Sequence, residues 1–199
     1  MIGVVCRIYN QCITSYFVIP DMSIGNDGYL INGAAVKNNI KIPATYLKNP
    51  LHFLSLGFGS GLMPKAPGTF GTLAAIPVYI LMSELNLVFF VAITLLITLV
   101  GIYLAGYTSK ALGVHDHSGI VIDEIAGYLI TMIAVPYDWV WIVTGFIFFR
   151  IFDILKPWPI SWLDKRVKGG FGIMIDDVLA GAFSLLCIHL TIYFVSLFS

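Results

Sequence analysis

The chain has 199 residues, of which 58% are hydrophobic and only 11% charged, and its mean hydropathy is +0.90. This composition excludes a disordered chain and is unusual for a water-soluble domain. The formal net charge is zero, so no basic excess indicates a nucleic-acid partner. We therefore expect one membrane domain and no nucleic acid.

Residues 1–50 differ in composition from the rest of the chain. They are rich in Asn, Gly and Asp, as in IGNDGYLINGAAVKNN, which is typical of loops and extensions. We interpret 1–50 as an N-terminal extension, mobile or dependent on a partner. The membrane domain is then expected over 51–199.

Long apolar runs separated by short polar loops predict the helices of this domain. The run Leu85–Ser109 contains no charged residue and is long enough to cross a hydrocarbon core of about 30 Å. The run Val178–Ser199 is nearly as clear, whereas the other segments are shorter or interrupted by Pro and Gly. The predicted fold class is all-α, a polytopic membrane bundle of about five helices, at 70–83, 86–109, 121–135, 139–155 and 174–197.

The distribution of charge orients this bundle. If all five segments cross, the N-terminus and the loops 110–120 and 156–172 share one side, which holds every Lys and Arg. The opposite side carries only Glu84 and Asp138 as charged residues. Because cytoplasmic loops of membrane proteins are enriched in Lys and Arg, we expect a multi-pass protein with its polar loops in the cytoplasm.

Five carboxylates interrupt apolar runs near the cytoplasmic ends of three predicted helices. A charge at the middle of a bilayer costs roughly 2.5–3.5 kcal/mol on insertion scales, so such residues indicate a functional site. Acids at a helix N-terminus also complement the helix dipole, which would explain the two adjacent pairs of acids. That explanation fails for Asp153, because it lies near a helix C-terminus, where a carboxylate is disfavoured. A shared divalent cation would offset the cost, and its candidate ligands are Asp123, Glu124, Asp153, Asp176 and Asp177. Since neighbours on a helix point about 100° apart, we expect one of each adjacent pair to face the centre.

Two cationic residues share a helical stripe with Asp153. Arg150, Asp153 and Lys156 recur every three residues, which is equally well explained by an intrahelical ion pair, with Lys156 reaching the interface. The functional interpretation assigns Arg150 and Lys156 to an anionic ligand. Arginine offers a planar fork to phosphate oxygens, and lysine offers a point charge.

Histidines and glycine-rich loops supply further candidates. His115 and His117 lie in the loop that leads to Asp123, so either is a candidate general base or metal ligand. The stretch GFGSGLMPKAPGT, which includes Ser60 and Thr69, is a weaker candidate for cradling a phosphate through backbone amides. We interpret His189, deep in the last helix, as a hydrogen-bonded histidine of the bundle.

The segments GFGSGLMPKAPGTFGTLAAIP, GVHDHSGIVIDEIAG and FRIFDILKPWPISWLDKRVKGGFGIMIDDVLAG together resemble the phosphatidylglycerophosphatase A family, from about Leu51 to Ile192. The resemblance implies a Mg²⁺-dependent phosphatase of the bacterial inner membrane. Its substrate would be a phospholipid of the inner leaflet, phosphatidylglycerophosphate, converted to phosphatidylglycerol and inorganic phosphate in phospholipid biosynthesis. The residues that match the family's motifs are His115, Asp116, His117, Asp123, Glu124, Arg150, Asp153, Lys156, Asp164, Asp176 and Asp177. Asp164 becomes a substrate-binding candidate through this resemblance alone.

Two other classes of function stay open beside it. The chain could act on a polyprenyl or other lipid phosphate, although the histidine-nucleophile signature of lipid phosphatases and the D-G-x₂-A-R signature of CDP-alcohol transferases do not occur. An ion or proton transporter would also need intramembrane acids. It predicts acids throughout the depth of the membrane, whereas here the five acids lie at one end.

Overall fold

A computed structural model describes residues 30–31, 34–35, 42–114 and 116–198. The chain divides into two compact units, Met1–Asn39 and Ile40–Ser199. In the first unit, the described residues form two short antiparallel strands, β1 (Leu30–Ile31) and β2 (Ala34–Ala35). Most of the proposed extension therefore lies outside the described residues, while Ile42–Pro50 belongs to the second unit.

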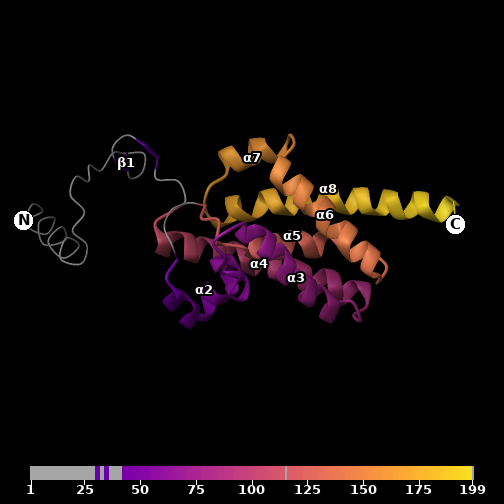
Figure 1. The fold of residues 1–199 in the computed structure, drawn as a ribbon, viewed down its shortest axis with the longest axis horizontal. Coiled ribbons are helices and arrows are strands. Elements are labelled where there is room, and N and C mark those ends of the chain that lie inside the picture. Colours follow the sequence, from indigo (N-terminus) through magenta and orange to yellow (C-terminus); the bar gives the residue numbers. More distant parts are fainter. Residues whose placement is uncertain (1–29, 32–33, 36–41, 115, 199) are drawn as a thin grey trace, which may run out of the picture. The chain divides into compact units, whose positions relative to one another are not determined.

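The second unit is helical throughout its described regular structure (Figure 1), as the sequence predicts. Its helices are η1 (Ala44–Lys48), α2 (Pro50–Ser55), η2 (Gly57–Leu62), α3 (Pro67–Met82), α4 (Leu87–Leu112), α5 (Ile122–Thr131), α6 (Trp139–Leu155), α7 (Ile160–Arg166) and α8 (Gly169–Phe198). The five expected helices correspond to α3, α4, α5, α6 and α8. The other helices, η1, α2, η2 and α7, are short and were not expected from the sequence.

Local signals explain several helix ends. The helix α6 has the predicted bounds because the Asp138 side chain accepts a hydrogen bond from the backbone N–H of Val140, which caps the first turn. The helix α5 ends at Thr131, earlier than expected, and Ala134 just beyond it adopts a left-handed φ of 57°. The helix α8 begins earlier than expected, at Gly169, whose φ is +79°. A glycine adopts that conformation without steric cost.

The helix α5 lies at the centre of the unit. It contacts α3, α4, α6 and α8, and most of its side chains are buried. Its backbone approaches α8 closely, because a Cβ atom added at Gly181 would lie only 2.5 Å from the carbonyl oxygen of Gly127. Small residues at such contacts let two helix backbones pack closely. Residues at the N-terminal end of α5 are thus surrounded by neighbouring helices.

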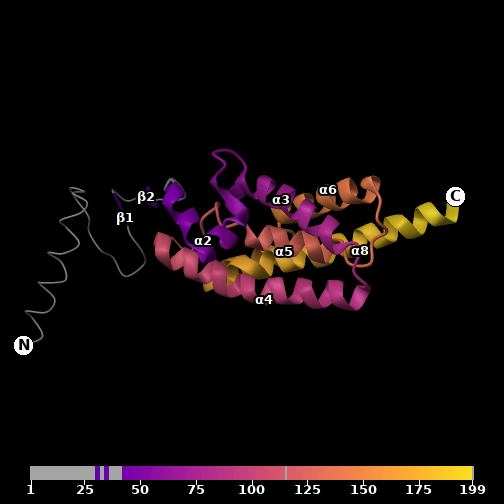
Figure 2. The ribbon, with the colours of Figure 1, turned by 90° about the horizontal axis from the view of Figure 1, so that it is seen from below.

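The longer helices run alongside one another in alternating directions (Figures 1 and 2). Cationic residues gather at one end of the unit: Lys65 precedes α3, Lys110 lies in the last turn of α4, and Lys168 precedes α8. The loops at the other end carry Glu84 and Asp138. The two ends therefore differ in charge, with the cations at the end where α5 begins.

Two helices, α4 and α8, are long and apolar enough to cross a membrane, and α3 is a shorter apolar helix. Large apolar side chains are exposed on the outward faces of several helices, including Leu99 of α4, Val143 of α6 and Leu190 of α8. An exposed apolar surface of this extent is typical of a protein that contacts lipid or a partner.

Candidate active site

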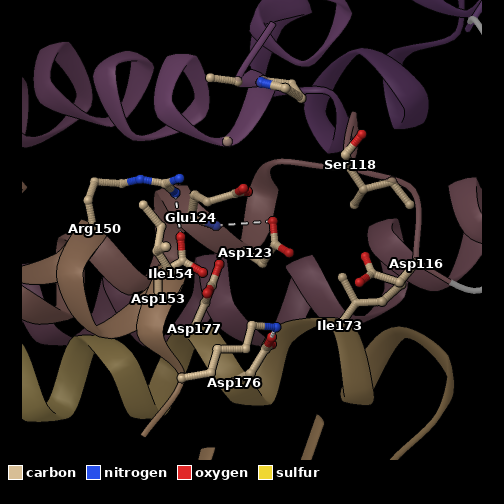
Figure 3. Close-up of a pocket in the computed structure, with 15 residues that line it drawn as sticks. Asp116, Ser118, Asp123, Glu124, Arg150, Asp153, Ile154, Ile173, Asp176 and Asp177 are labelled. Atoms are coloured by element: carbon tan, nitrogen blue, oxygen red, sulfur yellow. Dashed lines mark hydrogen bonds and ion pairs between the residues drawn. The ribbon is translucent and has the colours of Figure 1, made fainter. Parts of the chain in front are cut away.

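A cavity of about 290 Å³ lies where the N-terminal parts of α3, α5 and α8 meet the C-terminal part of α6. Carboxylates from three helices and the loop before α5 point into it (Figure 3). Its acidic lining residues are Asp116, Asp123, Glu124, Asp153, Asp176 and Asp177, and its cationic ones are Arg150 and Lys156. All five carboxylates that the sequence offers as metal ligands thus line one cavity.

Three of these carboxylates form the closest group. Oxygen atoms of Asp123, Glu124 and Asp177 all lie within 4.8 Å of one another. The Asp123 carboxylate also accepts a hydrogen bond of 3.1 Å from the backbone N–H of Glu124, which holds it at the start of α5. We call Asp123, Glu124 and Asp177 the carboxylate triad.

The expectation that one residue of each adjacent pair faces the centre is wrong. Asp123 and Glu124 both line the cavity, and so do Asp176 and Asp177. For the first pair the reason is position, because the cavity covers the end of α5 and side chains of the first turn reach it from either side. For the second pair, the cavity is wide enough for both neighbours to border it.

The donor set fits a divalent cation. Glu124 Oε2 and Asp176 Oδ1 are buried and lack a hydrogen-bond partner among the described residues. The six acids and two cations of the lining leave a formal excess of four negative charges when all are ionised. Burying uncompensated charge is costly, and clustered carboxylate oxygens are the ligands that Mg²⁺ prefers. A bound cation would satisfy these oxygens and offset the excess charge.

The two cationic side chains are held by carboxylates. Arg150 donates through Nη1 to Asp153 of its own helix, as the ion-pair interpretation predicts. Lys156 instead reaches other helices, donating to Asp176 of α8 and lying 3.4 Å from Asp164 of α7. Burial opposes the charge on Lys156, but Asp176 and Asp164 raise its pKa overall. The Nε atom of Arg150 is buried without a partner in the described structure, which leaves a donor for an anion.

Four of the remaining candidates lie outside the cavity lining. His117 is buried, and its Nδ1 accepts a hydrogen bond of 3.0 Å from the backbone N–H of Gly119, which orders the loop before α5. Asp164 reaches the site only through its ion pair with Lys156. Neither Ser60 nor Thr69 is among the residues that line the cavity. His115 lies outside the described residues.

The first part of the glycine-rich stretch, which forms η2, packs against the loop before α5. A Cβ atom added at Gly61 would lie 1.9 Å from the carbonyl oxygen of Gly119, so η2 packs backbone to backbone against the loop that carries His117. This close approach requires glycine at both positions. In the structure, the first part of the stretch positions this loop, whereas Ala66, Pro67 and Gly68 near its end line the cavity.

The sequence indicated the stretch that contains Gly68 as a phosphate cradle, but it did not place Gly68 against the acids, and it missed the apolar lining residue Ile154. Gly68, in the first turn of α3, lies directly over the site, because an added Cβ atom would be 2.3 Å from Glu124 Oε1 and 3.2 Å from Arg150 Nη1. Its neighbour Pro67 is a helix-start signal that could have placed Gly68 at the end of α3. Ile154 gave no such signal, since an apolar residue in an apolar helix is unremarkable in the sequence.

Comparison with known proteins identifies the family. Residues 53–192 match the family model for phosphatidylglycerophosphatase A. The chain is 51% identical to phosphatidylglycerophosphatase A of Escherichia coli over 139 residues, which cover 69% of this chain and 81% of that protein. It is 49% identical to phosphatidylglycerophosphatase A of Haemophilus influenzae over 144 residues, covering 71% and 88%. It is also 41% identical to a putative phosphatidylinositol-3-phosphatase of Bacteroides thetaiotaomicron over 143 residues, covering 68% and 89%. No solved structure matches the chain.

The matched segment contains the carboxylate triad and both cationic residues of the cavity. Membership in this family makes the chain an enzyme, which decides against the transporter interpretation. The chain belongs to the phosphatidylglycerophosphatase A family and is a phosphatase, a phosphoric monoester hydrolase.

Proposed function

We propose that this protein removes the terminal phosphate of phosphatidylglycerophosphate, giving phosphatidylglycerol and inorganic phosphate, as a step of phospholipid biosynthesis. Two relatives that carry this activity in their names are 51% and 49% identical to the chain. The observation that carries the proposal is the cavity in which six carboxylates converge beside Arg150 and Lys156. Metal-assisted hydrolysis of a phosphomonoester uses such a combination of cation ligands and anion-binding side chains.

The same proposal places the chain across the bacterial inner membrane, multi-pass, with the cavity facing the cytoplasm. The apolar helices α4 and α8 support a membrane location. The cationic end of the unit, where the cavity lies, supports the orientation, because Lys and Arg are enriched on the cytoplasmic side. There the cavity would meet phospholipid head groups of the inner leaflet.

We further propose Mg²⁺ as the cofactor, held mainly by the carboxylate triad. Asp153 and Asp176, each paired with a cation, would complete its surroundings or hold a second ion. When bound, a divalent ion supplies charge neutralisation and polarisation of the phosphoryl group. The buried, unpartnered oxygen of Glu124 supports this assignment.

The chain's own residues would then perform distinct tasks. Arg150 binds the non-bridging phosphate oxygens through its guanidinium, where charge redistributes in the transition state. Lys156 holds Asp176 and Asp164 and adds positive charge at the cavity wall. We assign protonation of the leaving glycerol oxygen to His115 or His117, which share the loop before α5.

The test is purified protein with phosphatidylglycerophosphate, with phosphate release measured in the presence of Mg²⁺ and of a chelator. The proposal predicts release that requires Mg²⁺ and yields phosphatidylglycerol as the lipid product. Absence of release at any Mg²⁺ concentration would refute the proposed substrate.

A second candidate substrate follows from the relative named as a phosphatidylinositol-3-phosphatase. The substrate that this name implies is phosphatidylinositol 3-phosphate, whose terminal phosphate is an ester of a secondary alcohol on the inositol ring. The terminal phosphate of phosphatidylglycerophosphate is an ester of a primary alcohol. Initial rates on the two lipids under identical conditions separate them. The higher identity to the phosphatidylglycerophosphatases favours the primary phosphate.

A further inference from the structure

The cavity has two exposed edges of opposite chemistry. One edge is polar and consists of Asp116 and Ser118, both exposed in the loop before α5. The other edge is apolar and consists of Ala66, just ahead of α3, and Ile154 of α6, which is 66% exposed. The other lining residues are buried or half-buried.

Ile154 continues a row of exposed apolar side chains along α6. These residues are spaced by three and four positions, so they share one face of the helix. We call them the α6 stripe: Val140, Val143, Ile147, Ile151 and Ile154. The stripe follows the helix from its first turn to the cavity, where it ends beside Arg150 and Asp153.

A lipid phosphate must satisfy two environments at once, because its phosphomonoester is joined to acyl chains through a short glycerol linker. The carboxylates and Arg150 suit the phosphate, and the exposed α6 stripe suits hydrocarbon. The polar edge at Asp116 and Ser118 offers acyl chains no apolar surface. Among the described lining residues, only those of the edge at Ala66 and Ile154 join the two environments.

We propose that the lipid substrate enters the cavity sideways from the bilayer, past Ala66 and Ile154, with an acyl chain lying along the α6 stripe. Water and the released phosphate then use the edge formed by Asp116 and Ser118. This inference rests on the proposed function, since it requires a phospholipid substrate.

A separate apolar groove is a poorer route for the lipid substrate to the cavity. It has a volume of about 240 Å³ and lies between α2, η2, α3, α4 and α5, where Phe58, Leu96 and Ile125 are among its lining residues. As described, it shares no lining residue with the carboxylate cavity. A lipid in this groove would have to pass α5 to bring its phosphate to the triad.

The first test compares Ile154→Trp with a matched control, Leu190→Trp, at a 48% exposed position of α8 outside the cavity lining. Full-length protein in detergent micelles is assayed on long-chain phosphatidylglycerophosphate and on a water-soluble analogue with four-carbon chains. We expect the ratio of kcat/KM for long over short chains to fall about tenfold in Ile154→Trp, because the bulky indole obstructs the path of a long acyl chain and displaces its contacts with the stripe, a loss of about this size. The ratio in Leu190→Trp should equal that of the wild type.

An unchanged ratio in Ile154→Trp would overturn the proposed entrance while leaving the proposed function intact. Failure of the wild type to cleave either lipid would refute the proposed function itself. The two failures are therefore distinguishable in one set of assays.

A second measurement needs no variant and does not depend on the folding of Ile154→Trp. Wild-type protein is photolabelled with phosphatidylglycerophosphate carrying a diazirine on one acyl chain, and the labelled peptides are identified by mass spectrometry. Labels on α6 between Val140 and Leu155 are expected. Labels confined to the groove around Phe58 and Leu96 would overturn the proposal.

Discussion

Among single residues, the carboxylate triad depends on contacts between helices that are distant in sequence. Asp123 and Glu124 come from the first turn of α5, whereas Asp177 comes from α8. Their oxygens approach within 4.8 Å because the glycine contact between Gly127 and Gly181 brings the two helices together. The site is thus built by packing as much as by the acids themselves.

The substitution Asp177→Asn should replace one carboxylate of the triad by a neutral amide of nearly the same shape. We expect Mg²⁺-dependent phosphate release to fall at least about a hundredfold, because the remaining acids bind the cation more weakly. Glu84→Gln, the same kind of change at the other end of the unit, serves as the control and should retain wild-type activity. Near-normal turnover in Asp177→Asn would remove Asp177 from the site.

The substitution Gly68→Ala places a methyl group where Glu124 Oε1 lies 2.3 Å away. We expect Glu124 or α3 to shift and turnover to fall about tenfold or more, since a displacement of about 1 Å at a catalytic centre is costly. Gly106→Ala is the matched control, because its added Cβ would meet its nearest atoms at 3.4 Å, an ordinary contact. Equal activity of the two variants would contradict the proposed role of Gly68.

At the scale of elements, α5 requires support at both ends because it is short and central. The segment just beyond its C-terminal end is held by His189 of α8, whose Nε2 lies 2.9 Å from the carbonyl oxygen of Ile133. This contact confirms His189 as a hydrogen-bonded histidine of the bundle.

The substitution His189→Leu should leave the carbonyl of Ile133 without this partner. We expect the unfolding free energy to drop by about 0.5–1.5 kcal/mol, which is the usual net contribution of one hydrogen bond, since this contact is only partly buried. Thermal unfolding in detergent measures the change as a lower Tm. Thr191→Val is the control, because Thr191 bonds only within its own helix, to the carbonyl oxygen of Cys187. If both variants unfold at the wild-type temperature, His189 does not support α5.

The helix boundaries show which parts of the fold local sequence determines. The start of α6 follows from the Asp138 cap, and its bounds could be predicted. The start of α8 could not, because GGFG is typical of a turn. In the structure, Gly170 packs against α4, where an added Cβ would lie 1.9 Å from the carbonyl oxygen of Ile102. That requirement comes from a helix distant in sequence.

Across the whole molecule, the separation of charge between the two ends leads to a topology that is open to experiment. Native cysteines are first replaced by serine, and single cysteines are then placed by Glu84→Cys and Lys168→Cys. In right-side-out vesicles, a membrane-impermeant maleimide should label Glu84→Cys at once and Lys168→Cys only after permeabilisation. Labelling of both variants from the same side would contradict the proposed orientation.

The chemistry of the site was easier to predict than its shape. Acids in apolar runs are conspicuous, so the sequence could locate Asp123, Glu124, Asp153, Asp176 and Asp177, and the structure brings all of them to one cavity. It could not show that adjacent acids both line the cavity, because that depends on the cavity's width. It indicated the stretch that contains Gly68 without singling out that glycine, and it could not select Ile154, because the importance of both comes from the side chains they meet.

The most direct test of the account is binding of Mn²⁺, as a paramagnetic substitute for Mg²⁺, to the purified full-length protein. Electron paramagnetic resonance measures free Mn²⁺ for the wild type and for the double variant Asp123→Asn, Asp177→Asn. The account predicts Mn²⁺ binding by the wild type that Mg²⁺ displaces, and an affinity at least about tenfold weaker in the double variant. Equal binding by both proteins, or none by the wild type, would contradict a cation site at the carboxylate triad.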